Sequence, residues 1–189
     1  TAQTVSREVT NLTKEIVSDA DTQGLKDKID TLLAESSDTD FNREVTSSIS
    51  KNRGSLFEGE NLDTYERRNG VTVGNRNTQM RQMGISLGDD VDERIVITAR
   101  IDGTMKGTLI ESKNRQSERT FGRGLSPWDR TQMIIYMTMF GFNDGKLVET
   151  FGDQQNEYTL EYDKGEWERI RSSLVFAVRR HILKIQHQD

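Results

Sequence analysis

Residues 100–116 read RIDGTMKGTLIESKNRQ, and this stretch decides the fold predicted for the chain. It joins a run rich in β-branched residues over 93–103 to a second run over 107–114, through a short connection typical of a β-hairpin. The first run carries Asp102 near its end, and the second contains Glu-Ser-Lys at 111–113. A strand that only filled a core would not carry these charges, so the hairpin forms either a reaction centre or a solvated edge.

Asp102 and Glu111 are expected to converge at one end of the sheet, because they lie on adjacent antiparallel strands joined by a tight turn. Two carboxylates and a nearby backbone carbonyl suit a hard cation such as magnesium. Lys113 lies two residues after Glu111, so strand alternation places both side chains on the same face. A lysine there can orient a water molecule or neutralise charge on a phosphate. On spacing alone, a pair of solvated charges explains the pattern equally well.

The chain before the hairpin is predicted to be largely helical. Apolar residues recur at helical spacing between residues 4 and 50, which indicates an N-terminal helical region over 1–50, ahead of a core over 51–189. The Asn69-Gly70 pair is a typical end of a helix. The elements expected next are a helix over 53–70, a short strand over 71–77 and a loop over 79–92.

Helices and strands alternate after the hairpin. A basic, glycine-containing loop over 115–127 comes first, and Ser126 followed by Pro127 is a typical helix start. The expected elements are then a helix over 127–140, strands over 146–152 and 157–163, and a closing helix over 164–186. This order predicts an α/β (α+β) fold in which a central mixed β-sheet is flanked by helices.

The composition excludes several classes of protein. The 189 residues contain no cysteine, which removes disulfides, thiol nucleophiles, cysteine-bound zinc and iron–sulfur clusters. The net charge of −5 gives no overall basic character, so a nucleic-acid partner needs a local basic surface. No apolar run is long enough to span a bilayer and no secretory signal is visible, which favours a soluble intracellular protein without a membrane partner.

Further motifs lie on either side of the hairpin. QMIIY at 132–136 fits a Gln-x-x-x-Tyr helix signature, and RGSLFEGE at 53–60 fits a Gly-x-x-x-Glu helix. With Asp-Gly at 102–103 and Glu-x-Lys at 111–113, these motifs resemble, in order, those of the PD-(D/E)XK nuclease superfamily, in its lambda-exonuclease-like (YqaJ/RecB-like) branch. The resemblance covers roughly residues 53–180 and implies a restriction-endonuclease-like core.

The resemblance implies a role for each matching position. Asp102 and Glu111 would bind Mg²⁺, for which Mn²⁺ would substitute, and Lys113 would position the attacking water. Gln132 would hydrogen-bond near that lysine or a substrate phosphate, and Tyr136, one helical turn later, would face the same way. The implied metal ligands are Asp102, Glu111, Ser112 through its carbonyl group, and Glu58, which also joins the catalytic set.

Basic residues gather around these motifs although the chain is acidic overall. We expect the loop after the Glu-x-Lys strand to contact phosphates, because its arginines lie next to Gly122 and Gly124, whose backbone amides can approach a phosphate closely. Packing is favoured over base stacking for Phe121 and Trp128. The candidate nucleic-acid-binding residues are Arg53, Arg115, Arg119, Arg123 and Tyr136.

These residues predict a Mg-dependent deoxyribonuclease that hydrolyses the phosphodiester bonds of DNA. The resemblance favours an exonuclease that acts on duplex ends, in recombination or in viral or phage DNA processing. The alternatives are an endonuclease with the same core, or a non-catalytic module that binds nucleic acid or protein on this scaffold. DNA is the expected partner, a homo-oligomer is compatible with the resemblance, and a phage, viral or bacterial setting fits it.

Overall fold

The computed structural model describes residues 57–89, 91–115 and 117–186. The chain divides into two compact units, Thr1–Asn61 and Leu62–Asp189. The helices predicted over residues 1–50, and the candidate residue Arg53, lie outside the described residues. The predicted division into an N-terminal region and a core therefore stays a prediction.

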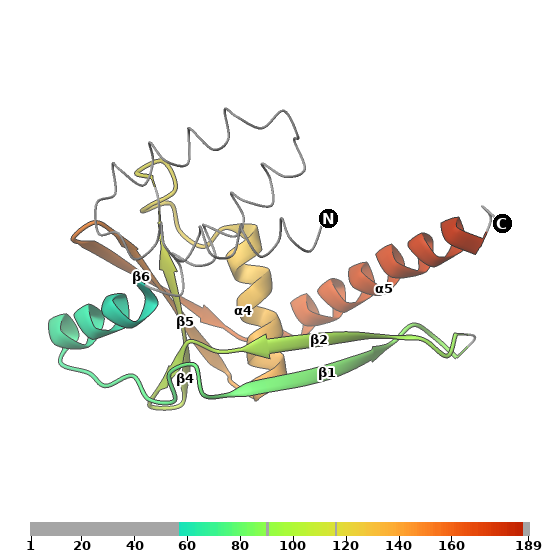
Figure 1. Cartoon of the computed structure of the whole chain (residues 1–189), viewed down its shortest axis with the longest axis horizontal. Coiled ribbons are helices and arrows are strands. Elements are labelled where there is room, and N and C mark those ends of the chain that lie inside the picture. The colour runs from blue at the N-terminus through green and yellow to red at the C-terminus, as the bar shows by residue number, and fades with distance from the viewer. Residues whose placement is uncertain (1–56, 90, 116, 187–189) are drawn as a thin grey trace, which may run out of the picture. The chain divides into compact units, whose positions relative to one another are not determined.

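The second unit is a mixed α+β fold built on a four-stranded sheet (Figure 1). Its strands, in their order across the sheet, are β3 (Gly103–Met105), β4 (Thr108–Asn114), β5 (Asp144–Phe151) and β6 (Gln154–Glu161). β4 and β5 run parallel, whereas the other neighbouring pairs are antiparallel. A mixed sheet flanked by helices confirms the predicted fold class and is consistent with a restriction-endonuclease-like core.

Helices pack on both faces of this sheet, because side chains alternate along each strand. Leu109 and Leu147 belong to the same core cluster as Met133, on the face covered by α4. Ile110 and Val148 point the other way and pack with apolar side chains of the helical residues 62–69. The helices are residues 57–69 as far as the structure describes them, α4 (Pro127–Phe140) and α5 (Lys164–Gln186).

The predicted boundaries of α4 are confirmed, and local chemistry explains them. Ser126 has an extended backbone and its hydroxyl accepts a hydrogen bond from the N–H group of Asp129, while Pro127 occupies the first turn. The helix ends at Gly141, whose φ of 75° is the left-handed conformation that glycine adopts most easily. The closing helix is also confirmed, as α5, and the two strands predicted after α4 are present as β5 and β6, which begin two and three residues earlier than predicted.

The loop predicted over 79–92 is wrong, because part of it is a strand. β1 (Met80–Ser86) pairs antiparallel with β2 (Arg94–Arg100) in a separate two-stranded sheet. Met83 and Ile85 of β1 pack on the core, whereas the other residues of the strand are exposed. Because the exposed face is polar and Gly84 lies within the strand, the sequence does not show the alternation that is typical of a half-buried strand.

The strand predicted over 93–103 is broken. β2 ends at Arg100 and β3 starts at Gly103, because β2 pairs with β1 whereas β3 pairs with β4. Asp102 lies at the break, so the change of sheet places this carboxylate beside β4. The hairpin turn between β3 and β4 is Lys106-Gly107, whose φ angles of 50° and 87° are typical of a two-residue type I′ turn.

The short strand predicted over 71–77 is also wrong. In the described chain this segment makes an isolated bridge between Gly74 and Thr104. A Cβ atom on Gly103 would lie 2.4 Å from Cγ1 of Val73, so only glycine permits this close approach. The segment thus packs against the start of β3 without extending the sheet.

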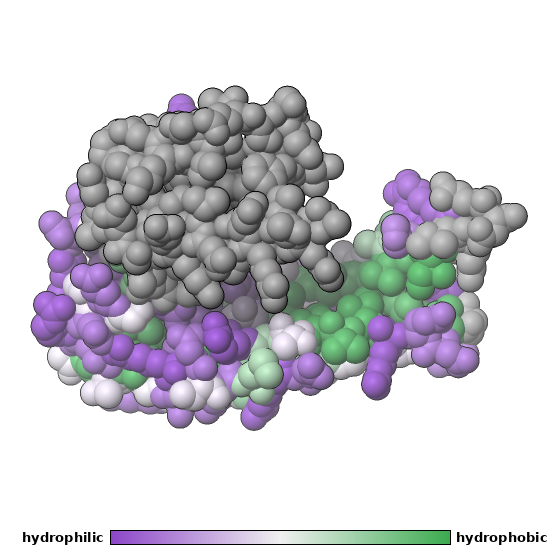
Figure 2. All heavy atoms as spheres, in the orientation of Figure 1, coloured by the Kyte–Doolittle hydropathy of each residue, from purple (hydrophilic) through white to green (hydrophobic). Residues whose placement is uncertain are grey.

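One face of α5 packs on the core. Trp167 is buried there, and Ile170 and Leu174 lie against the same cluster. Figure 2 shows apolar side chains gathered along α5, where Phe176 is 67% exposed. Among the described residues, the structure contains no helix with both the length and the apolar character needed to traverse a membrane.

Candidate active site

β4 changes character along its length. Leu109 is fully buried in the core beneath α4, whereas Glu111 and Lys113 follow on the same face and form a polar row. Arg115 continues this row just beyond the end of β4, and the first half of α4, which carries Gln132, contacts it. The candidate site therefore forms where the apolar core ends, beside the carboxyl ends of the parallel strands β4 and β5.

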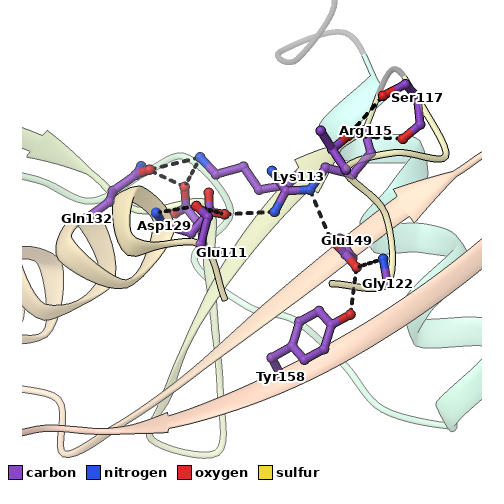
Figure 3. Close-up of polar contacts among 11 residues, drawn as sticks. Glu111, Lys113, Arg115, Ser117, Gly122, Asp129, Gln132, Glu149 and Tyr158 are labelled. Carbon is purple, nitrogen blue, oxygen red and sulfur yellow. Dashed lines mark hydrogen bonds and ion pairs between the residues drawn. The ribbon is translucent and has the colours of Figure 1, made fainter. Parts of the chain in front are cut away.

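Glu111, Lys113 and Gln132 form a closed set of contacts (Figure 3). Nζ of Lys113 donates to Oε1 of Glu111 at 2.8 Å and to Oε1 of Gln132 at 2.9 Å. Nε2 of Gln132 donates to the same oxygen of Glu111 at 2.7 Å. The side chain of Glu111 is 3% exposed and that of Lys113 is 27% exposed, so the ammonium group is the more open member of the pair.

Gln132 also joins the charged pair to Tyr136. Its Nε2 atom donates to the hydroxyl oxygen of Tyr136 at 2.9 Å, across one turn of α4. The orientation of the amide follows from its partners, because only its carbonyl oxygen can accept from an ammonium group and only its NH₂ group can donate to a carboxylate. Burial and the charge of Glu111 raise the pKa of Tyr136, so its hydroxyl stays protonated at neutral pH.

Asp102 lies beside these residues, at the break between β2 and β3. Its Oδ2 atom accepts a hydrogen bond of 2.7 Å from the backbone N–H group of Ser112. Burial lowers the pKa of Lys113, but the charges of Glu111 and Asp102 outweigh it and the net pKa is raised. The same two charges raise the pKa of Tyr136, so both predicted carboxylates lie near the same pair of side chains.

The structure brings together some of the predicted site residues. Those adjoining one another are Asp102, Glu111, Ser112, Lys113, Gln132 and Tyr136. Glu58 is partly buried and belongs to the first compact unit, so its approach to this site stays a prediction. Within the described ranges, no group of three or more acidic or histidine side chains is arranged to hold a metal ion.

The arginines of the loop after β4 lie in two different environments. Arg119 and Arg123 are exposed, which suits contact with a phosphate. Arg115 is only 17% exposed, and it donates from Nε to Glu149 at 2.9 Å and from Nη2 to Asp129 at 2.8 Å. The prediction of a phosphate contact for Arg115 did not anticipate these partners, which use two of its nitrogens.

Glu149 and Asp129 are buried acids that the sequence analysis did not single out. Oε1 of Glu149 accepts hydrogen bonds from the Gly122 N–H group at 2.7 Å and from the Tyr158 hydroxyl at 2.8 Å (Figure 3). Oδ2 of Asp129 accepts from the hydroxyl of Ser126, the N-cap of α4. The Ser-x-x-Asp pattern was a signal for the cap, and an acid directly after the apolar pair Leu147-Val148 of β5 was a signal for Glu149.

The two aromatic residues near the loop also differ. Phe121 packs on Phe151, with ring centroids 5.8 Å apart, which confirms the packing expected for it. Trp128 is 82% exposed, so the packing expected for it is wrong. The first turn of α4 extends beyond the apolar core, whose α4 members begin at Met133.

We expect Glu149 to make the stability of the protein sensitive to acid. Burial raises the pKa of Glu149, but hydrogen bonds from Arg115, Gly122 and Tyr158 outweigh it, so the net pKa is lowered. A carboxylate with a lowered folded-state pKa stabilises the fold above its unfolded pKa, near about pH 4, and this stabilisation is lost as the pH falls through the folded-state pKa. Glu149→Gln should therefore cost about 1–3 kcal/mol of unfolding free energy at neutral pH and less in acid.

Urea unfolding of the wild type and Glu149→Gln between about pH 7 and pH 3 measures this difference. The gap between their unfolding free energies should narrow as the pH falls. A gap that stays constant, or that widens in acid, would contradict the prediction.

Comparison with known proteins supports the fold. No family model and no curated protein matches the sequence. The crystal structure of SSO0001 is similar over 71% of this chain, with 18% identity and a TM-score of 0.51, and the chain spans 64% of that protein's length. Similarity at this identity supports the fold alone.

LHK-Exo, an alkaline exonuclease from Laribacter hongkongensis, is a further similar structure. Its TM-score is 0.47 at 15% identity, over 92% of both chains. Its complex with dAMP gives 0.48 at 16% identity, over 90% of both chains.

Proposed function

We propose that the chain is a metal-dependent nuclease that hydrolyses phosphodiester bonds in DNA. The observation that carries this proposal is the convergence of Asp102, Glu111 and Lys113 at one end of the sheet, beneath Gln132 of α4. Two carboxylates and a charged lysine in a partly buried site are groups that metal-assisted phosphodiester hydrolysis uses. The sequence resemblance to PD-(D/E)XK nucleases assigns the same residues.

The oxygen donors of this site fit a hard divalent cation. Mg²⁺ often binds through one or two carboxylates and keeps several waters, so Asp102 and Glu111 meet its requirement without a third acid among the described residues. In this proposal the carbonyl group of Ser112 is a further ligand, Glu58 contributes from its helix, and Mn²⁺ can replace Mg²⁺. When bound, such an ion activates water and neutralises charge on the phosphate.

The side chains around the carboxylates orient the reacting groups. The ammonium group of Lys113 is held by Glu111 and Gln132 and stays charged, so it can orient the attacking water or stabilise charge that develops on the phosphate. Gln132 forms hydrogen bonds with both Glu111 and Lys113, and it donates a further hydrogen bond to the hydroxyl of Tyr136. α4 therefore orients the charged side chains at the carboxyl end of β4.

We further propose an exonuclease that acts on duplex ends, in recombination or in viral or phage DNA processing. This part of the proposal rests on the motif resemblance to lambda-exonuclease-like proteins. The reacting groups serve an endonuclease equally well, because hydrolysis of an internal or a terminal phosphodiester needs the same chemistry.

A cleavage assay tests both parts of the proposal. Linear duplex DNA, linear single strands, closed circular DNA and RNA would each be incubated with the protein in Mg²⁺, in Mn²⁺ or in EDTA. We expect either ion to support degradation of the linear duplex, EDTA to prevent it, and the closed circle to survive. Cleavage of the circle would identify an endonuclease, and failure to cleave any substrate with either ion would overturn the nuclease proposal.

Arg119→Ala and Arg123→Ala should each weaken DNA binding to a similar extent across sequences. Both side chains are exposed, and loss of one phosphate contact should flatten the dependence of binding on salt by about one unit. Titration of labelled duplex at several salt concentrations measures this effect. Arg171→Ala, which removes an exposed arginine from α5, is the matched control. If neither loop variant changed the salt slope, the loop would not lie on the DNA.

A further inference from the structure

Two rows of polar side chains face each other at the candidate site. Lys113 lies on β4 and Arg115 lies just beyond its end, two residues later, so the two side chains continue one row. On α4, Gln132 and Asp129 are three residues apart and are neighbours on the helix surface. Lys113 contacts Gln132, and Arg115 contacts Asp129, so α4 and β4 are joined by two adjacent polar contacts.

Arg115 also joins this pair of elements to β5. Its Nε atom donates to Glu149, whereas its Nη2 atom donates to Asp129, so one planar group contacts acids on two different elements (Figure 3). Glu149 has no exposed surface and Asp129 is 4% exposed. Losing one partner of such a buried ion pair is costly, because the other charge stays out of water. The guanidinium therefore has one favoured position.

The apolar contacts of α4 do not provide the same precision. The side chains with which α4 packs on the core include Met133, Met137 and Met139. Methionine is flexible and fills irregular gaps, so these contacts tolerate small shifts of the helix. Directional hydrogen bonds at the start of α4 are therefore the contacts that can set the position of Gln132.

We propose that Arg115 is a positioning residue. Through its ion pairs with Asp129 and Glu149 it fixes the start of α4, so that Gln132 stays hydrogen-bonded to Glu111 and Lys113. This role rests on the proposed nuclease function for its effect on catalysis. Arg115 therefore differs from the exposed arginines of the same loop, because it acts through another side chain and does not contact DNA.

A double-mutant cycle tests this role. Arg115→Lys keeps the positive charge but cannot donate from two nitrogens in a fixed fork. We expect it to slow single-turnover DNA cleavage by about 10- to 100-fold, as is typical when a partner that orients a catalytic ligand is lost. DNA affinity should change by less than about threefold, because no phosphate contact is lost. In a Gln132→Ala background, Arg115→Lys should slow cleavage by less than about threefold, since contacts acting through one residue are not additive.

The side-chain amide resonance of Gln132 gives a readout that needs neither metal nor DNA. Gln132→Ala identifies this resonance by its disappearance, and Arg115→Lys should shift it in the metal-free protein. Glu157→Gln is the matched control, because Glu157 accepts hydrogen bonds from Tyr65 and Lys146 on the opposite face of the sheet from α4. The control should leave both the resonance and the cleavage rate unchanged.

The outcomes separate the positioning role from the proposed function. A resonance that does not move, or equal slowing by Arg115→Lys with and without Gln132, would overturn the role of Arg115. A wild type that cleaves no DNA would overturn the nuclease function, while the resonance would still decide whether Arg115 positions Gln132. If Arg115→Lys does not fold, Asp129→Asn provides the same test, because it removes the charge on α4 and leaves the Arg115–Glu149 pair in place.

Discussion

Glu111→Gln is expected to slow cleavage of linear duplex DNA by at least about 10²-fold while the protein stays folded. The substitution keeps the shape of the side chain and one oxygen that can accept from Lys113 and Gln132. It removes the negative charge, which is the property that makes this buried group a ligand for a hard cation. The loss should therefore appear in the rate far more than in the fold.

Single-turnover cleavage in excess Mg²⁺ measures this effect, and thermal unfolding checks the fold. Asp102→Asn should behave in the same way, because its amide oxygen can still accept from the Ser112 N–H group. Glu157→Gln makes the same chemical change on a carboxylate of the opposite sheet face and should cleave normally. Cleavage by Glu111→Gln within about threefold of the wild type would show that this carboxylate does not act in the reaction.

Lys113→Ala is expected to lower the cleavage rate by about 10²-fold or more and DNA affinity by much less. The ammonium group is fixed by two hydrogen bonds, to Glu111 and to Gln132, so it is already oriented before substrate arrives. A preorganised ammonium group acts mainly by stabilising the charge that develops in the transition state. Lys113→Arg should restore little activity, because a planar guanidinium cannot replace a compact ammonium in a partly buried site.

Parallel measurements of single-turnover rate and equilibrium DNA binding decide the role of Lys113. If the lysine only neutralises Glu111, Lys113→Ala should change both quantities little and to the same degree. In that case Lys113 and Glu111 would form an ordinary ion pair on the hairpin, of the kind that contributes about 0–1 kcal/mol to stability when exposed. A large loss of rate with nearly unchanged binding supports a role in the transition state.

Several elements could be predicted because their causes are local. The start of α4 follows from Ser126 and Pro127, and its end from Gly141, all of which act within one turn of the helix. The shared face of Glu111 and Lys113 follows from alternation along one strand. In each case the residues that decide the structure are close in sequence, so their pattern is sufficient.

β1 and the break at Asp102 could not be predicted in the same way. A polar segment becomes a strand here because β2 pairs with it and its few apolar side chains reach the core. The break arises because the strands before and after Asp102 have different partners. Pairing of this kind depends on the other strands of the sheet, so the residues of one segment do not predict it.

The sequence by itself determined the class of fold, the limits of α4 and α5, the presence of the two strands between them, and the choice of Asp102, Glu111 and Lys113 as the candidate site. Only the tertiary structure decided that Arg115 is held by acids 14 and 34 residues away and is not open to solvent like its neighbours in the loop. An arginine is suited equally to a phosphate and to a carboxylate, so its residue type and its spacing do not distinguish the two. Arg115 pairs with carboxylates here because packing buries Asp129 and Glu149, and these buried charges require a compensating cation.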